Sequence, residues 1–332
     1  MNLSYAKERQ IGIEAVYKAS HLCKAVFSKL VQSQTIVKTD ASPVTIADFG
    51  AQAVVNHLIH KHFPNDPIVG EEDSKDLQTN HTLRDQVVEL SNSVLDSPLS
   101  TEQILTSIDL GNYEGGGKGR FWTLDPIDGT KGFLRGEQFA VCLALIVDGV
   151  VQVAIQGCPN LPTDLNDPQS PRGSLFIAVK GQGSFERTLE DVKEKQIFVS
   201  NVKLPSETTF CESVEAAHSS QGAAADIASK LGITKQSVRM DSQCKYAIIA
   251  RGDAGIYLRV PTRADYVEKI WDHAGGSLLV SEAGGQVCDV EGNPLDFTQG
   301  RTLKKNKGII ASNQHILSNV VQVVQEVINK KA

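Results

Sequence analysis

Three features that would assign the chain to a familiar class are missing from its sequence. The first ten residues contain no apolar stretch of the kind that a secretory signal requires, and the longest apolar run, near residues 139–147, is too short to cross a bilayer. The six cysteines show no CxxC spacing, which argues against a zinc site or a disulfide framework. Acidic residues outnumber basic ones, and the net charge of −6 argues against a nucleic-acid polymer as partner. We therefore expect a soluble protein with buried free thiols, located in the cytoplasm with access to the nucleus, and bound to no membrane.

What the sequence does contain is enough apolar residues for more than one hydrophobic core. The chain has 332 residues, of which 41% are apolar, and a chain of this length usually exceeds a single core. Up to residue 204 the pattern predicts an α+β domain, with helices at 16–30, 46–62 and 83–95 and strands at 68–69, 139–147, 150–156, around 181–183 and at 197–199. From residue 205 to 332 strands and helices alternate, which favours an α/β domain, with strands at 210–215, 256–260, 286–290 and 308–311 and helices at 223–231, 243–250, 272–283 and 315–330.

The most informative segment for chemistry is Trp122-Thr123-Leu124-Asp125-Pro126-Ile127-Asp128-Gly129-Thr130. Asp125 and Asp128 follow a predicted strand, and Pro126 between them favours a rigid turn because its ring fixes φ. Such a turn can direct both carboxylates and the intervening backbone carbonyl to one point, and the free N–H groups that follow suit a phosphate. Taken alone, the same residues also fit an ordinary Asx-turn that only ends a strand.

Two further acidic segments support the chemical interpretation. Glu71 and Glu72 follow a short predicted strand, and Asp272 opens a predicted helix in the second half of the chain. Mg²⁺ binds hard oxygen ligands and usually keeps water and substrate phosphate oxygens around it. Together with Asp125 and Asp128, Glu71 and Asp272 would supply such ligands. Glu72 fits a place beside the metal site and a solvated position equally well.

Two stretches resemble the signatures of the inositol monophosphatase superfamily. They are W-x-x-D-P-I-D-G-T at 122–130 and W-D-x-A-G-x-x-L-x-x-x-E-A-G-G at 271–285, both complete and in the expected order. Within that superfamily, the runs at 129–138, 111–116 and 42–45 are similar to the fungal and plant 3′(2′),5′-bisphosphate nucleotidases. The resemblance covers most of the chain apart from residues 73–107. It implies a layered αβαβα sandwich of the sugar-phosphatase type, with the site between the two halves.

The resemblance also implies a role for each matching residue. Metal ligands for two or three Mg²⁺ ions would be Glu71, Asp125, Asp128, Asp272 and the Ile127 carbonyl. The catalytic pair that deprotonates the attacking water would be Asp48 and Thr130, although Asp48 also fits a capping box begun by Thr45. Substrate contacts would come from Gly129, Thr130, His218, Ser242, Lys245, Arg259 and Asp272. Because Mg²⁺ prefers oxygen ligands, His273 is predicted to be a helix-face histidine.

Other protein classes fit these residues less well. A haloacid dehalogenase-like phosphatase needs its two acids two positions apart, whereas Asp125 and Asp128 are three apart. A Walker P-loop needs Ser or Thr after Lys118, where this chain has Gly119. A non-catalytic sensor of adenosine bisphosphate would have lost a ligand or base, and all of the expected ones are present. An inositol phosphate or fructose bisphosphate phosphatase of the same superfamily stays an alternative because its chemistry would be identical.

The activity that the resemblance implies is removal of the 3′-phosphate from 3′-phosphoadenosine 5′-phosphate, which gives AMP and phosphate. The sulfated analogue, 3′-phosphoadenosine 5′-phosphosulfate, would be a second substrate. Lys245 and Arg259 favour a nucleotide because cations suit a second phosphate that the metals do not reach. A monomeric state, a role in sulfate assimilation and salt tolerance, and inhibition by Li⁺ and Na⁺ are further expectations.

Overall fold

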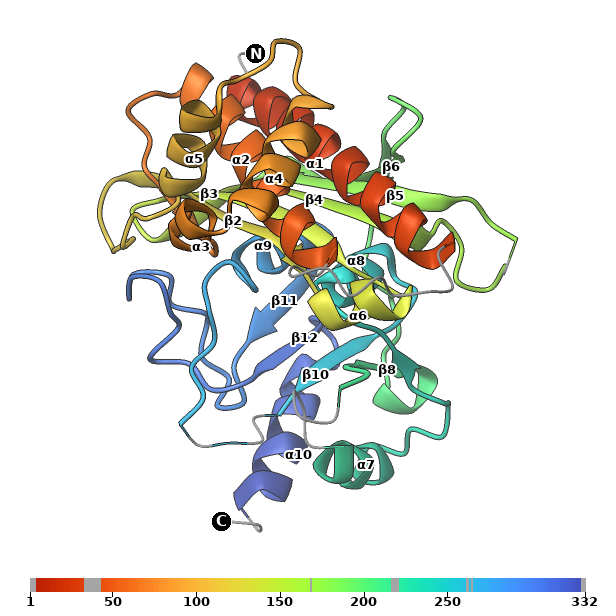
Figure 1. Ribbon diagram of the computed structural model, residues 1–332. Helices are drawn as coiled ribbons and strands as arrows, with labels where there is room; N and C mark the ends of the chain where they lie inside the picture. The colour runs from red at the N-terminus through yellow and green to blue at the C-terminus, as the bar shows by residue number, and fades with distance from the viewer. Residues whose placement is uncertain are drawn as a thin grey trace.

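Two β-sheets organise the protein, whose computed structural model describes residues 4–32, 43–167, 169–215, 221–260, 263 and 265–329. The first sheet lies in the upper half of Figure 1 and the second in the lower half. Helices cover both outer faces and also lie between the sheets, so the order of layers is αβαβα, as the family resemblance implies. Within the described ranges, no helix combines the length and the apolar character that a bilayer crossing requires.

The first sheet contains seven strands in the order of the sequence: β1 (Ile68–Gly70), β2 (Arg120–Asp128), β3 (Ala140–Val147), β4 (Val150–Pro162), β5 (Arg172–Val179), β6 (Gly183–Thr188) and β7 (Lys195–Ile197). β1 runs parallel to β2, and every later pair is antiparallel. The predicted hairpin between β3 and β4 is present, and its turn residues Asp148 and Gly149 both have positive φ. β3 is an almost continuous buried run because helices pack on both faces of the sheet.

Helices α1 (Ala6–Gln32) and α2 (Pro43–His62) cover one face of the first sheet (Figure 1). Apolar side chains of both helices form a core with alternate residues of β2 to β5. Three shorter helices, α3 (Lys75–Thr79), α4 (His81–Asn92) and α5 (Thr101–Asp109), pack outside α2 around a separate apolar cluster. The weakly patterned segment 73–107 is therefore a helical layer, of which the sequence predicts only α4.

The middle layer consists of α8 (Cys244–Arg251) and α9 (Ala274–Glu282). α9 packs on β4 and β5 of the first sheet and on β11 of the second, and nearly every residue of both helices is buried. The second sheet has the strand order β11 (Gly285–Cys288), β12 (Ile309–Asn313), β10 (Ile256–Arg259), β8 (Phe210–Glu212) and β9 (Val238–Arg239). Helices α7 (Gln221–Lys230) and α10 (Leu317–Asn329) cover its outer face (Figure 1).

Further features of the secondary structure differ from expectation, among them the start of α2 and the presence of β9. α2 begins at Pro43, not near residue 46, so Thr45 lies inside its first turn and the predicted capping box with Asp48 is wrong. Proline is favourable at a helix start because the N–H that it lacks has no helical partner there. β9 is absent from the prediction because two residues are too short for a detectable pattern.

The chain passes from the first sheet to the second between Ile197 and Phe210. The predicted boundary between domains 1–204 and 205–332 falls in this interval, close to the one-turn helix η1 (Pro205–Glu207). The middle helices α8 and α9 follow this boundary in sequence, yet they fill the space between the two sheets. The division into two domains stays a prediction, since the second half supplies packing for the first.

Close packing inside the middle layer can be tested at Gly276. A Cβ at this position would lie 2.2 Å from the Tyr246 ring, so Gly276→Ala forces α8 and α9 apart. We expect a loss of about 1–3 kcal/mol in the free energy of unfolding, measured by urea denaturation. The matched control is Gly222→Ala on α7, where no atom lies within 4 Å of the added Cβ. That variant should gain roughly 0.5–1 kcal/mol, and equal stability of the two variants would contradict the packing argument.

Candidate active site

β2 brings Asp125 and Asp128 to the same face of the first sheet through a β-bulge. In a regular strand, residues three apart point to opposite faces. Here Asp125 pairs with Cys142 and Asp128 with Ala140, so three steps along β2 match only two along β3. The extra residue lies at 126–127, where proline is tolerated because a bulge leaves backbone groups unpaired. Both carboxylates therefore share the face of Cys142 and Ala140, which packs toward the middle helices.

A cavity of about 210 Å³ opens between this face and the second half of the chain. Ten of the predicted site residues line it: Glu71, Asp125, Ile127, Asp128, Gly129, Thr130, Ser242, Lys245, Arg259 and Asp272. Glu71 follows β1, Asp272 precedes α9, and Gly129 caps the short helix α6 (Thr130–Arg135). Gly129 has a φ of 90°, and a Cβ there would lie 2.8 Å from the Cβ of Ser242. Residues far apart in the sequence thus converge as predicted.

Burial and mutual repulsion oppose the ionisation of the acids in this cavity. The pKa of Glu71 is raised to about 7 by burial and by the neighbouring charges of Glu72 and Asp128. Burial also raises the pKa values of Asp125 and Asp272 well above their usual range, and nearby carboxylates add to the effect. A bound cation would offset both the burial of these carboxylates and their mutual repulsion.

The oxygen atoms of this acidic wall fit a hard divalent cation. Oδ1 of Asp125 is buried and has no hydrogen-bond partner within the described part of the chain. A buried carboxylate oxygen without a partner is costly, so it favours a ligand that supplies positive charge. Carboxylate and carbonyl oxygens suit Mg²⁺, and the cavity lining contains no thiol that would select a softer metal.

In a second group of ligand-type residues, two of the three members are already satisfied by hydrogen bonds. Glu268, Asp272 and His273 bring ligand atoms within 4.8 Å of one another. Nδ1 of His273 lies 2.8 Å from the Tyr246 hydroxyl and Nε2 lies 3.1 Å from Glu268, while Glu268 also accepts a 2.7 Å hydrogen bond from Arg259. Because both ring nitrogens are engaged, His273 and Glu268 are better described as a hydrogen-bonded chain that holds Arg259. His273 is 1% exposed and precedes α9, so its prediction as a helix-face histidine is wrong.

Buried cations form the opposite side of the cavity. Nζ of Lys245 donates to the carbonyls of Ser242, at 2.8 Å, and Met240, at 3.3 Å. Burial lowers the pKa of Lys245, whereas the carboxylate of Asp128 raises it. The side chain of Arg259 is 12% exposed and is paired with Glu268. The cavity therefore offers positive charge from the second half of the chain, facing an acidic wall in which Glu71, Asp125 and Asp128 come from the first half.

Gln243 connects Asp128 at the end of β2 to Trp271 in the second half of the chain, and the sequence gives no role for it. Its backbone N–H donates to a carboxylate oxygen of Asp128, and its side-chain amide donates to the Trp271 carbonyl at 2.8 Å. The preceding residue, Ser242, has a φ of 65°, a left-handed conformation that is uncommon for a residue with a side chain. Such backbone strain is typical of functional sites, but it cannot be read from a single sequence.

Two predicted site residues are not placed in the cavity lining. Asp48 is 6% exposed on α2, and its pKa is raised by burial and by the adjacent Glu72 and Glu71. It therefore lies beside the acidic wall, but in the described ranges no hydrogen bond joins it to Thr130. His218 falls outside the described residues. The roles of Asp48, Thr130 and His218 stay predictions.

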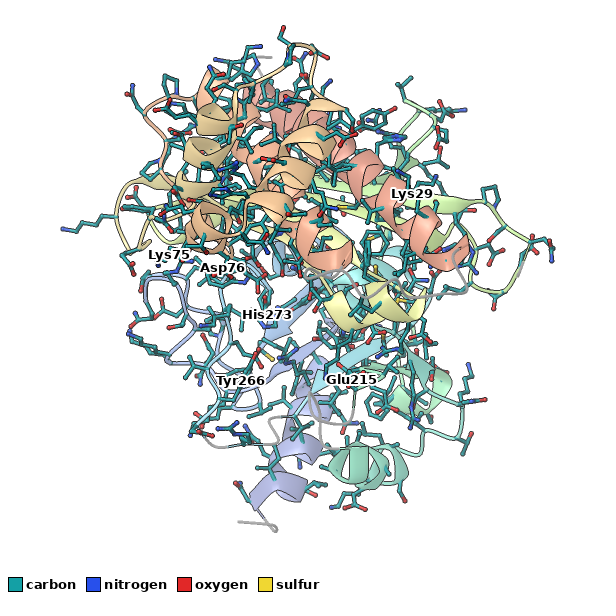
Figure 2. The ribbon with its side chains drawn as sticks, in the orientation of Figure 1. Lys29, Lys75, Asp76, Glu215, Tyr266 and His273 are labelled. Atoms are coloured by element: carbon teal, nitrogen blue, oxygen red, sulfur yellow. The ribbon has the colours of Figure 1, made fainter. Side chains whose placement is uncertain are left out.

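Ion pairs surround the mouth of the cavity. Lys131 pairs with Glu215 at 3.1 Å, and Arg135 contacts both Glu215 and Asp241. In Figure 2, His273 is labelled where the two halves meet, with Tyr266 and Glu215 on the lower half. α6 is thus held to the second half by charge pairs at the rim, which the sequence alone does not specify.

Known proteins resemble this chain over nearly its whole length. Residues 5–329 match the Inositol monophosphatase family. A 3′(2′),5′-bisphosphate nucleotidase of Schizosaccharomyces pombe is 48% identical over 344 residues, which cover 99% of this chain and 98% of that protein. A protein of the same name from Oryza sativa is 42% identical and covers 98% and 96%.

Solved structures share the fold at much lower identity. An inositol monophosphatase from Anabaena matches with a TM-score of 0.63 at 20% identity, over 98% of this chain and 97% of that one. CysQ from Bacteroides thetaiotaomicron matches with a TM-score of 0.62 at 19% identity, over 94% and 99%. The layered architecture, both signature stretches and the close fungal and plant relatives lead to one conclusion: this chain belongs to the inositol monophosphatase family.

Proposed function

We propose that the protein is a Mg²⁺-dependent phosphatase that hydrolyses 3′-phosphoadenosine 5′-phosphate to AMP and phosphate. The observation that carries this proposal is a single cavity lined by carboxylates on one side and by Lys245 and Arg259 on the other. A substrate with two phosphate groups suits such a cavity, since one group can approach the acids through a metal and the other can approach the cations. The names of the fungal and plant relatives support the same substrate.

The metal ligands in this proposal are Glu71, Asp125, Asp128, Asp272 and the Ile127 carbonyl, for two or three Mg²⁺ ions. Bound divalent ions would neutralise phosphate charge and lower the pKa of the attacking water. Occupation of one such position by Li⁺ or Na⁺ would account for inhibition by these ions. The repulsion among these carboxylates supports a strong requirement for a divalent ion.

Residues of the chain itself would orient the reacting groups. Asp48 would accept the proton of the attacking water through the Thr130 hydroxyl, because a hydroxyl alone is a poor base. The backbone N–H groups of Gly129 and Thr130 would donate to the phosphoryl oxygens. These residues lie on α2 and at the start of α6, next to the acidic wall.

The second phosphate and the nucleoside would contact the other side of the cavity. Lys245 and Arg259 would bind the 5′-phosphate, with Ser242 and His218 as further contacts. The same contacts would admit the sulfated analogue, 3′-phosphoadenosine 5′-phosphosulfate. A role in sulfate assimilation and salt tolerance, carried out by a monomer in the cytoplasm, belongs to the same proposal.

Asp125→Asn tests the acidic wall. We expect turnover to fall by more than about 100-fold, because even residues that only support a metal ligand cost 10–100-fold when changed. The same substitution removes one of several repelling buried acids, so thermal unfolding in the presence of a chelator should shift upward, not downward. Near-normal turnover at saturating Mg²⁺ would contradict the role of Asp125 as a ligand.

Lys245→Met tests the substrate. The loss of a charged hydrogen bond of about 1.5–3 kcal/mol should raise KM for 3′-phosphoadenosine 5′-phosphate roughly 10- to 100-fold. Hydrolysis of 3′-AMP, which lacks the 5′-phosphate, should change much less, and thermal unfolding shows whether the variant is folded. An equal loss on both substrates would contradict a contact with the 5′-phosphate. If the unmodified protein released phosphate faster from inositol monophosphate than from 3′-phosphoadenosine 5′-phosphate, this result would contradict the assignment of a nucleotide substrate.

A further inference from the structure

Arg301 extends from the second half of the chain to the strand end that carries Glu71. It lies in the loop between β11 and β12. Nη1 donates to the carbonyls of Gly111, at 3.2 Å, and Tyr113, at 2.9 Å, and Nη2 donates to the carbonyl of Gly70. Gly70 immediately precedes Glu71. The guanidinium therefore fixes the backbone from which the Glu71 side chain projects.

The same residue also holds the segment that carries Asp272. Its guanidinium lies 4.9 Å from the centre of the Trp271 ring, in a cation–π contact next to Asp272. Its own carbonyl accepts a 3.1 Å hydrogen bond from Ile270, and Thr302 forms an antiparallel bridge with Lys269. The contact with the Trp271 ring and the backbone hydrogen bonds thus hold residues 269–272 against the loop that contains Arg301.

Arg301 joins two carboxylates that repel each other. Glu71 and Asp272 come from different halves of the chain, line the same cavity and interact unfavourably when both are charged. Arg301 is not part of the cavity lining; besides a charge interaction with Glu71, it contacts the residues that precede both carboxylates. We propose that Arg301 is a positioning residue that fixes Glu71 relative to Asp272 for divalent metal binding. This inference rests on the proposed function, because it requires that these carboxylates hold Mg²⁺.

The chemistry of the contacts explains why arginine occupies this position. Three carbonyl acceptors and one aromatic face require a planar group with several fixed donors, and a guanidinium supplies both. Lysine keeps the charge but has a single rotatable ammonium group. It therefore cannot donate to all three carbonyls and stack on the Trp271 ring at the same time. A comparison of arginine with lysine therefore separates positioning from a purely electrostatic effect.

Contacts within the first half cannot replace those of Arg301. Gln52 on α2 accepts a 3.0 Å hydrogen bond from the Glu72 backbone and donates to the Ile108 carbonyl at 3.0 Å. These bonds hold the strand end to α2, inside the same half of the chain. Arg301 contributes the connection to the segment of Asp272.

The test measures Mg²⁺ binding to the full chain by titration calorimetry, without substrate, for the unmodified protein and for Arg301→Lys. We expect the Kd for Mg²⁺ to rise about 10- to 100-fold in this variant, as for other residues that orient metal ligands. With 3′-phosphoadenosine 5′-phosphate, the Mg²⁺ concentration for half-maximal rate should rise by a similar factor. Most of kcat should return at saturating Mg²⁺, because Arg301 does not touch the cavity.

Arg120→Lys is the matched control. Arg120 also combines several acceptors, on Asp66 and Glu8, with an aromatic ring, Phe63 at 5.4 Å, but it joins elements of the first half only. We expect this variant to lower thermal stability while leaving the Kd for Mg²⁺ unchanged.

The outcomes separate this inference from the proposed function. Equal Mg²⁺ affinity of Arg301→Lys and the unmodified protein would overturn the positioning role and leave the proposed function intact. Equal weakening in Arg301→Lys and Arg120→Lys would also overturn it, because a general loss of stability would then explain both. Absence of Mg²⁺ binding to the unmodified protein would overturn the proposed function together with this inference.

Discussion

The site depends on keeping like charges together. Glu71, Asp125, Asp128 and Asp272 line one cavity, and burial and mutual repulsion work against their ionised forms. Repulsion cannot hold these carboxylates in place, so other groups of the chain must restrain them. The Gln243 backbone donates directly to the Asp128 carboxylate, whereas Arg301 holds the residues that precede Glu71 and Asp272. The tightly packed middle layer behind these contacts keeps the two sheets at a fixed separation.

The β-bulge in β2 determines the layer toward which Asp125 and Asp128 point. Ile127 packs in the apolar core beneath α1 and α2, on the opposite face from Asp125 and Asp128. Without the extra residue, one of the two aspartates would point into that core, where an unpaired carboxylate costs several kcal/mol. The bulge therefore places both acids toward the middle helices. One extra residue in β2 thus places two carboxylates on the sheet face that forms one wall of the cavity.

The sequence predicts the parts of this structure whose signals are local. The hairpin at Asp148-Gly149 follows from turn chemistry, and three of the four predicted ligand acids that line the cavity lie in the two signature stretches. The bulge could not be predicted, because its effect depends on the partner strand. α3 and α5 are absent from the prediction because both helices are short and are stabilised by packing in the apolar cluster on α2, although α5 begins with a Ser100–Gln103 capping box. The contacts of Arg301 join residues far apart in the chain and leave no pattern around it.

The segment 268–273 links the two sides of the cavity. Glu268 fixes Arg259 on the cationic side, His273 fixes Glu268, and Asp272 between them belongs to the acidic side. The segment is held to the loop of Arg301 by the pairing of Lys269 with Thr302. A displacement of these six residues would therefore move Asp272 together with Glu268, the partner of Arg259. If Arg259 binds one phosphate and Asp272 holds a metal at the other, as proposed, one short backbone segment couples a contact on each side of the cavity for a substrate with two phosphates.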